Sequence, residues 1–183
     1  MKRQWALVAI GAWLAGTVCM SIVATENFYT IDRLLTDSRS AAFTSTVERL
    51  GHPLARDFLR YLSSELNRLY FQMWNVAQIG LAAAALWLVA GSEAQNAAQP
   101  RVGRMASAAA KAILTMLGIV VLMLVYLTPA IVSLGRELDF VPREPAPPGM
   151  SRFWVLHAAY TSLEMLKLAA GVVAAALIAR RSG

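Results

Sequence analysis

A histidine, a glutamate and a lysine interrupt the last apolar stretch of this 183-residue chain. In HAAYTSLEMLK, residues 157–167, His157, Thr161 and Glu164 are spaced to share one face of an α-helix, with Tyr160 and Lys167 on its flank. A glutamate three residues before a lysine can form an ion pair. Imidazole and carboxylate groups also bind metals, haem iron or protons. These residue types therefore allow either a structural ion pair or a ligand site.

The stretch that carries these residues is one of four long apolar runs. Of all residues 57% are hydrophobic and only 15% are charged, where a soluble domain has about a quarter charged. The runs lie at about 5–25, 68–91, 111–135 and 152–179, and roughly 20 helical residues cross the hydrocarbon core of a bilayer. The sequence predicts an all-α integral membrane protein, a single four-helix bundle.

Basic residues are concentrated in three segments that lie on one side of such a bundle. Seven of them, with one acid, account for the whole net charge of +6: Lys2, Arg3, Arg101, Arg104, Lys111, Arg180 and Arg181. The positive-inside rule then predicts that both termini and a linker at 92–110 are cytoplasmic, in the plasma (inner) membrane. This distribution favours contact with anionic lipid and argues against nucleic acid as a partner.

The segment between the first two spans, 27–67, is predicted to be an amphipathic outer loop. A short helix over 40–50 should end at Gly51, and Pro53 suits the first turn of another helix that runs into the second span. Leu54, Phe58 and Leu62 recur near helical spacing, so we expect this segment to lie on the outer membrane surface. The alternative is a platform for a protein partner. The REPAPPG stretch, 143–149, predicts a non-helical outer turn.

Charges near the bilayer centre need partners, because an isolated one costs at least ~2.5–3.5 kcal/mol. The second span offers polar residues on a broad face, and its Gln78 is predicted to lie about as deep as Glu164, near 15–18 Å. We therefore predict that the second and fourth spans touch along a polar seam. Its members are Arg68, Gln72, Asn75, Gln78, Tyr160, Thr161, Glu164 and Lys167.

Other residues within the runs predict how the helices pack. Pro129 should bend the third span, and the lone Cys19 is interpreted as a small core residue. Trp5 and Trp154 are expected to be interfacial anchors. Small residues in the first span should permit close helix approach: Gly11, Ala12, Ala15 and Gly16.

His157 is the candidate ligand for haem or metal. Ligation of haem by two histidines needs a second one in the membrane, but His52 lies in the outer loop. A symmetric dimer could bring two copies of His157 together. Two ligands in one helix fall short of a metal site. The sequence contains no phosphate loop, nucleophile elbow or paired-carboxylate hydrolase pattern, so an enzyme is not favoured.

Three stretches resemble a family of small four-helix membrane proteins related to transmembrane protein 205, grouped with copper-resistance D-like and HemJ-type proteins. They are GAWLAG (11–16), LNRLYFQMWNVAQIGL (66–81) and RFWVLHAAYTSLEMLKL (152–168). The resemblance implies haem-associated oxidation or copper import for some members, and only His157 carries over as a candidate position. This chain lacks a histidine in the first span and its eight methionines form no MxxM cluster. Both departures count against those activities.

Two functions follow from these observations. The first is a non-enzymatic accessory or structural subunit of a membrane complex, with membrane-protein partners or further copies of itself. The alternative is a haem- or metal-binding membrane protein, a small transporter or oxidoreductase that uses His157, Glu164 and Lys167. An accessory protein should satisfy every polar group of the seam, whereas a cofactor protein should hold a cavity beside His157.

Overall fold

Four long helices make up the computed structural model, which describes residues 1–95 and 100–180. They are α1 (Lys2–Asp37), α3 (His52–Gln95), a continuous helix built from α4 (Pro100–Leu122), η1 (Met123–Leu127) and α5 (Thr128–Glu137), and α6 (Met150–Ala179). A short helix, α2 (Ala41–Leu50), joins the first two. Each long helix is apolar and long enough to cross a membrane. The chain is therefore an all-α membrane-spanning bundle, as predicted.

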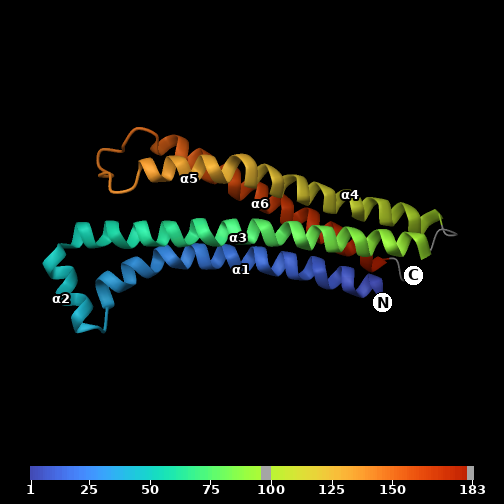
Figure 1. Ribbon diagram of the computed structural model, residues 1–183, viewed down its shortest axis with the longest axis horizontal. Coiled ribbons are helices and arrows are strands. Elements are labelled where there is room, and N and C mark those ends of the chain that lie inside the picture. Colours follow the sequence, from blue (N-terminus) through green and yellow to red (C-terminus); the bar gives the residue numbers. More distant parts are fainter. Residues whose placement is uncertain (96–99, 181–183) are drawn as a thin grey trace.

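The four long helices form a ring in which each has two neighbours. α1 packs against α3 and α6, and α4 packs against the same two helices. As a result α3 and α6 lie on opposite corners of the bundle. The start of α1 and the end of α6 lie at one end, the termini end, while α2 and the segment 138–149 lie at the other, the loop end (Figure 1).

The segment 27–67 is helical over most of its length and does not lie flat across the end of the bundle (Figure 1). α1 continues to Asp37, and α3 begins at His52 and runs beside it (Figure 1). With 36 and 44 residues they are about 54 and 66 Å long, far more than the ~30 Å hydrocarbon core. The two helices project beyond the apolar band because polar bonds join them there. The Asn27 amide donates to Asn67 Oδ1 at 2.6 Å, and Ser63 Oγ donates to the carbonyl of Asn27.

Local signals at the loop end behave as the sequence indicates. Ser40 caps α2 by accepting a hydrogen bond from the Phe43 N–H, and α2 ends at Gly51, whose φ of +82° suits glycine. Pro53 lies in the first turn of α3. Residues 138–149 form no regular helix.

The linker predicted at 92–110 is shorter than expected. α3 continues to Gln95 and α4 already begins at Pro100, while 96–99 lie outside the described residues. The reason is local: residues 104–110, RMASAAA, are rich in alanine, the strongest helix former.

The third long helix is irregular one turn before Pro129. Residues Met123–Leu127 form a π-helix, in which the Thr128 N–H donates to the Met123 carbonyl five residues back. Pro129 has no N–H to continue the ordinary pattern, so the widened turn fits the predicted perturbation at this position. The wide turn places Thr128 against α3.

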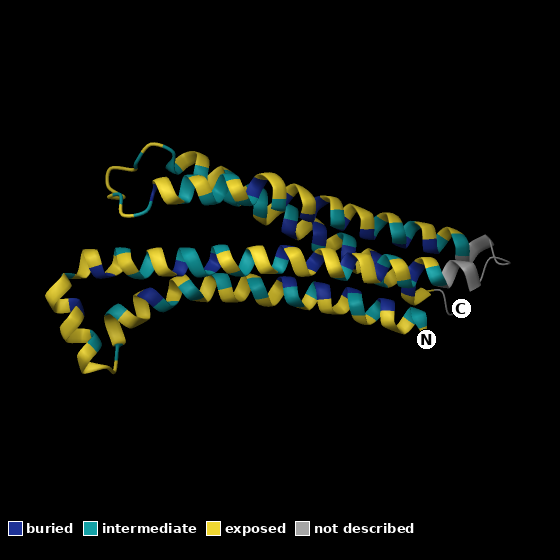
Figure 2. Cartoon of the chain, in the orientation of Figure 1, coloured by how far each residue is buried: buried dark blue, intermediate teal, exposed yellow. Residues whose placement is uncertain are grey.

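The two ends of the bundle differ in packing (Figure 2). Toward the termini end, small and branched residues form one dry core that includes Ile10, Ala82, Ala85, Ile113 and Ala174. Toward the loop end the inward positions of α3 are polar, at Ser63, Asn67, Asn75 and Gln78. The dry half holds the helices together, and the polar half contains the candidate site.

Candidate functional site

A buried ion pair lies where the two halves meet. Lys167 Nζ is 2.8 Å from Glu164 Oε1, and the two residues are 1% and 6% exposed. Both belong to the buried stripe of α6, which continues through Gly171, Ala174 and Ile178. The predicted pairing of Glu164 with Lys167 is confirmed, and so is the need for further partners at this depth.

Gln78 is the main partner of this pair. Its Oε1 accepts hydrogen bonds from Lys167 Nζ and from Trp13 Nε1, the latter at 2.8 Å. Its Nε2 donates to Asn75 Oδ1 at 3.2 Å, and Asn75 Nδ2 lies 3.5 Å from Thr128 Oγ1. These residues form what we call the buried polar cluster: Trp13, Asn75, Gln78, Thr128, Glu164 and Lys167. One member comes from α1 and one from α5, while α3 and α6 contribute two each. The cluster therefore connects all four long helices.

Three members of the predicted seam lie elsewhere. Gln72 is exposed on the outside of α3, because it lies about a quarter of a turn around the helix from the mean direction of the inward positions 71, 75 and 78. Thr161 is also exposed, and its hydroxyl donates to the carbonyl of His157 within α6. Arg68 is half-buried nearer the loop end, where it pairs with Glu65 and Asp139 rather than with the cluster.

The predicted contact between the second and fourth spans holds for side chains only. Lys167 reaches Gln78 across the diagonal of the bundle, and the rings of Phe71 and Tyr160 meet edge to face at 5.6 Å. The helix backbones of α3 and α6 are not neighbours in the ring. Similar expected depths pointed to this side-chain contact, but they could not distinguish a neighbouring helix from a diagonal one.

A cavity of about 450 Å³ opens above the cluster, toward the loop end. α1, α3, α5 and α6 all contribute to its lining, and so does the segment that follows α5. Apolar side chains including Phe71, Phe153 and Met165 form much of the wall. Glu164 lies at the deep end, next to the cluster, while Tyr160 is one helical turn and His157 two turns nearer the loop end. This is the arrangement expected of a small-molecule site: an apolar wall with few polar groups.

Three polar atoms of the cavity lining make no hydrogen bond of ordinary geometry among the described residues. They are Glu164 Oε2, the Tyr160 hydroxyl and His157 Nδ1, all buried. An unpaired buried polar group costs free energy, so native proteins usually satisfy such groups with protein, water or ligand. All three belong to residues that line the cavity.

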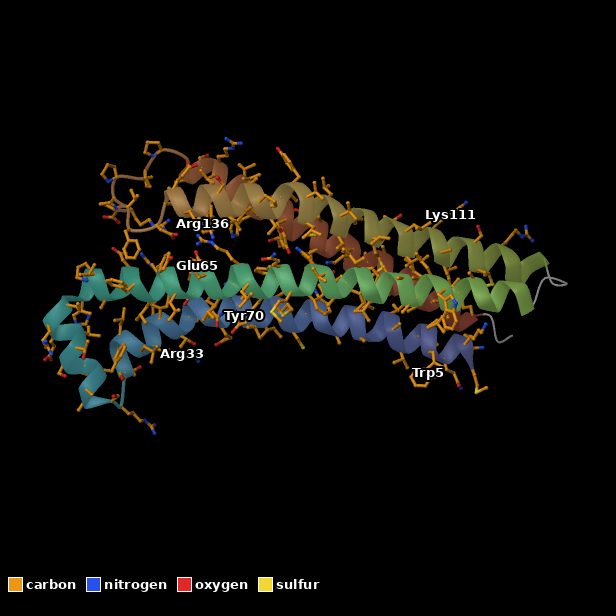
Figure 3. All side chains as sticks on the ribbon, viewed as in Figure 1. Trp5, Arg33, Glu65, Tyr70, Lys111 and Arg136 are labelled. Carbon is orange, nitrogen blue, oxygen red and sulfur yellow. The ribbon has the colours of Figure 1, made fainter. Side chains whose placement is uncertain are left out.

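Ion pairs join the walls of the cavity toward the loop end. Arg68 Nη2 of α3 lies 3.2 Å from Asp139 Oδ2, which follows α5, so this pair bridges two walls of the cavity. Figure 3 shows Arg136 of α5 and Glu65 of α3 pointing toward each other across the same gap; Arg136 Nε is 3.7 Å from Glu65 Oε1.

His157 and Cys19 bear on the metal and haem hypotheses. The His157 ring packs against Phe153 with centroids 4.3 Å apart, and it lines the cavity. Among the described residues no group of three His, Cys, Asp or Glu side chains is placed to hold a metal ion. Cys19 is exposed on the bundle surface, so the prediction that it is a core residue is wrong.

Sequence reasoning missed Trp13 and Thr128 as members of the cluster. Trp5 and Trp154 are exposed near helix ends, as expected of anchors, but Trp13 is fully buried and donates to Gln78. The position of Trp13 in the middle of the first span could have indicated its role, because an indole N–H in the membrane needs a hydrogen-bond acceptor.

Searches for related proteins found no matching family model, no matching curated protein and no matching solved structure. The resemblance to the family of transmembrane protein 205 stays a prediction.

Proposed function

We propose that this protein binds a small amphipathic molecule in the cavity above the buried polar cluster. The observation that carries the proposal is the set of unpaired polar atoms, led by Glu164 Oε2, in the lining of a cavity of about 450 Å³. A purely structural ion pair has no need of a cavity beside it. Four helices contribute to the site, so the whole bundle serves as the scaffold.

The accessory-subunit function has less support. It requires the bundle or a partner to satisfy every polar group, and Glu164 Oε2 is buried inside the bundle without a hydrogen-bond partner among the described residues. The haem alternative remains a specific form of the proposed function, because His157 lines the same cavity.

We also propose that the cavity faces the outer side of the plasma membrane. The basic residues near the start of α1, in α4 and at Arg180 all lie toward the termini end. By the positive-inside rule that end is cytoplasmic, which places the cavity toward the outer leaflet.

Two valines on the third long helix provide a matched test. Val132 lines the cavity, whereas Val125 is exposed on the outside of the bundle. Val132→Trp should fill the cavity and Val125→Trp should not. Native mass spectrometry of protein purified in mild detergent should show an added mass on the wild type and on Val125→Trp that is absent from Val132→Trp. If each of the three proteins has only the mass of its own bare chain, the proposal is contradicted.

An absorption spectrum of the same samples tests the haem alternative. A Soret band that sharpens on reduction with dithionite and disappears in His157→Ala would identify the bound molecule as haem. A featureless spectrum together with an added mass would identify a non-haem ligand.

A further inference from the structure

We propose that the ligand is a neutral, hydroxyl-bearing amphiphile whose hydroxyl donates to Glu164 Oε2 and accepts from Tyr160. This inference rests on the proposed function and specifies the chemistry of the molecule that the cavity takes. It follows from which hydrogen-bonding groups the cluster uses internally and which it leaves over.

The internal bonds of the cluster use up its donors. Lys167 Nζ donates to both Glu164 Oε1 and Gln78 Oε1, and Trp13 Nε1 also donates to Gln78. The Gln78 amide N–H donates to Asn75. The group left over at the cavity is an ionised acceptor, Glu164 Oε2, on a residue that is 94% buried. A ligand that satisfies it must bring a hydrogen-bond donor.

The Tyr160 hydroxyl adds a donor at the same place. It lies near the Glu164 carboxylate, one turn earlier on α6, and the two groups interact, but neither the hydroxyl nor Glu164 Oε2 makes a hydrogen bond of ordinary geometry among the described residues. Its ring is fixed against Phe71, with centroids 5.6 Å apart. A ligand group that both donates and accepts, as a hydroxyl does, satisfies Glu164 and Tyr160 together. An ammonium group donates but cannot accept.

Charge favours a neutral ligand over a cation. The charged residues that line the cavity balance, with Arg68 and Arg143 against Asp139 and Glu164. Behind the lining, Lys167 pairs with Glu164 and Glu65 pairs with Arg68, so the balance is unchanged. An added cation would be an uncompensated charge in a region of low dielectric, which costs more than it does in water.

The walls suit an apolar body attached to that hydroxyl. Phe28, Phe71, Phe153 and Met165 present rings and a thioether to the cavity. Alcohols and phenols that dissolve in the outer leaflet combine the two properties, and they reach this depth of the membrane without crossing it.

Three probes of one shape separate these possibilities. They are para-hexylphenol, its methyl ether, which accepts but cannot donate, and para-hexylbenzylamine, which is cationic at neutral pH. Binding to the full-length protein in lipid nanodiscs is measured by equilibrium dialysis, and the amount taken up by Val132→Trp nanodiscs is subtracted as lipid partitioning. Because a hydrogen bond to a charged group is worth ~1.5–3 kcal/mol, the phenol should bind about tenfold or more tighter than the ether. The amine should bind more weakly than the phenol.

Equal affinity for phenol and ether, or tighter binding of the amine, would overturn this inference. If Val132→Trp blocks all three probes without any preference among them, the ligand chemistry is wrong but the cavity still binds ligands. If Val132→Trp takes up as much of every probe as the wild type, the proposed function itself fails.

Tyr160→Phe provides a second, conservative test. It keeps the ring that packs on Phe71 and removes only the hydroxyl. Both phenol and ether should lose affinity, because each accepts from Tyr160, while the phenol-to-ether ratio should persist because Glu164 is intact. An unchanged affinity for the phenol in a variant with a wild-type melting temperature would remove Tyr160 from the site.

Discussion

At the scale of single residues, the centre of this protein depends on Lys167. Its ammonium group satisfies one oxygen of Glu164 and the side-chain oxygen of Gln78 at once. With 1% of Lys167 exposed, no solvent can replace it if it is removed. Breaking a buried pair by deleting one partner is far more costly than replacing both partners by uncharged groups.

We therefore expect Lys167→Ala to lower the free energy of unfolding by about 3–5 kcal/mol, because it leaves Glu164 ionised and unpaired in the membrane. Glu164→Gln combined with Lys167→Met should be much less damaging. Unfolding titrations in mixed micelles measure both changes. Equal losses for the two variants would show that the groups do not act as a charge pair.

A pair of glycines on α1 gives a second residue-scale prediction. A Cβ at Gly16 would clash with the Trp74 ring, whereas a Cβ at Gly11 has nothing within 4 Å. Gly16→Ala should lower the free energy of unfolding by about 1–3 kcal/mol through overpacking. Gly11→Ala, in the same helix, should be neutral or slightly stabilising, since alanine favours helix. Similar melting temperatures for the two variants would contradict the close contact of α1 with Trp74.

At the scale of elements, the inward face of α3 changes character along its length. It reads Ser63, Asn67, Asn75 and Gln78 toward the loop end, then Ala82, Ala85 and Val89 toward the termini end. The polar part binds side chains of other helices, and the small part lets α1 and α4 approach closely. One helix thus supports both the cavity and the dry core.

Crosslinking tests which helices are neighbours. In a background in which Cys19 is replaced, cysteines at Asn27 and Asn67 should be joined by a short bifunctional thiol reagent, because these side chains are in contact between α1 and α3. Cysteines at Gln78 and Glu164 should not be joined by the same reagent, because α3 and α6 lie on the diagonal. The reverse result, read on a gel after cleavage between the spans, would require a different helix order.

Much of this fold follows from the sequence, and the exceptions have physical reasons. Apolar runs define the spans, and the spacing of Glu164 and Lys167 predicts their pair. Gln72 was misplaced because the second span carries polar residues on more than one side, and periodicity alone does not say which side faces inward. Thr128 was missed because its orientation depends on the π-turn before Pro129. The cavity depends on how the helices separate toward the loop end, and no single stretch encodes that separation.

At the scale of the whole molecule, the bundle is longer than a membrane is thick. Since the apolar band ends near Arg68 and Arg136, the remainder of α1 and α3, with α2 across their tip, extends beyond that band (Figure 1). Exposed aromatic residues remain on this extension, with Phe58 and Tyr61 each 5.4 Å from Phe140.

Cysteine labelling on intact cells tests both the extension and the orientation. With Cys19 replaced, Ser45→Cys in α2 should react with a membrane-impermeant maleimide from outside. Arg104→Cys, at the start of α4, should react only after the cells are permeabilised. Both positions are exposed in the structure. Labelling of Arg104→Cys alone on intact cells would reverse the orientation.

The apolar core at the termini end affects how far a ligand can move along the bundle. Ile10, Ala82, Ile113, Ala174 and Ile178 fill the space directly below the polar cluster, and each is fully buried. A molecule that enters the cavity therefore meets closely packed apolar side chains at its inner end. In this conformation the proposed binding cavity is filled by packed side chains at its inner end. Ligand occupancy of the proposed cavity would then depend on the ligand concentration on one side of the membrane and not on the other.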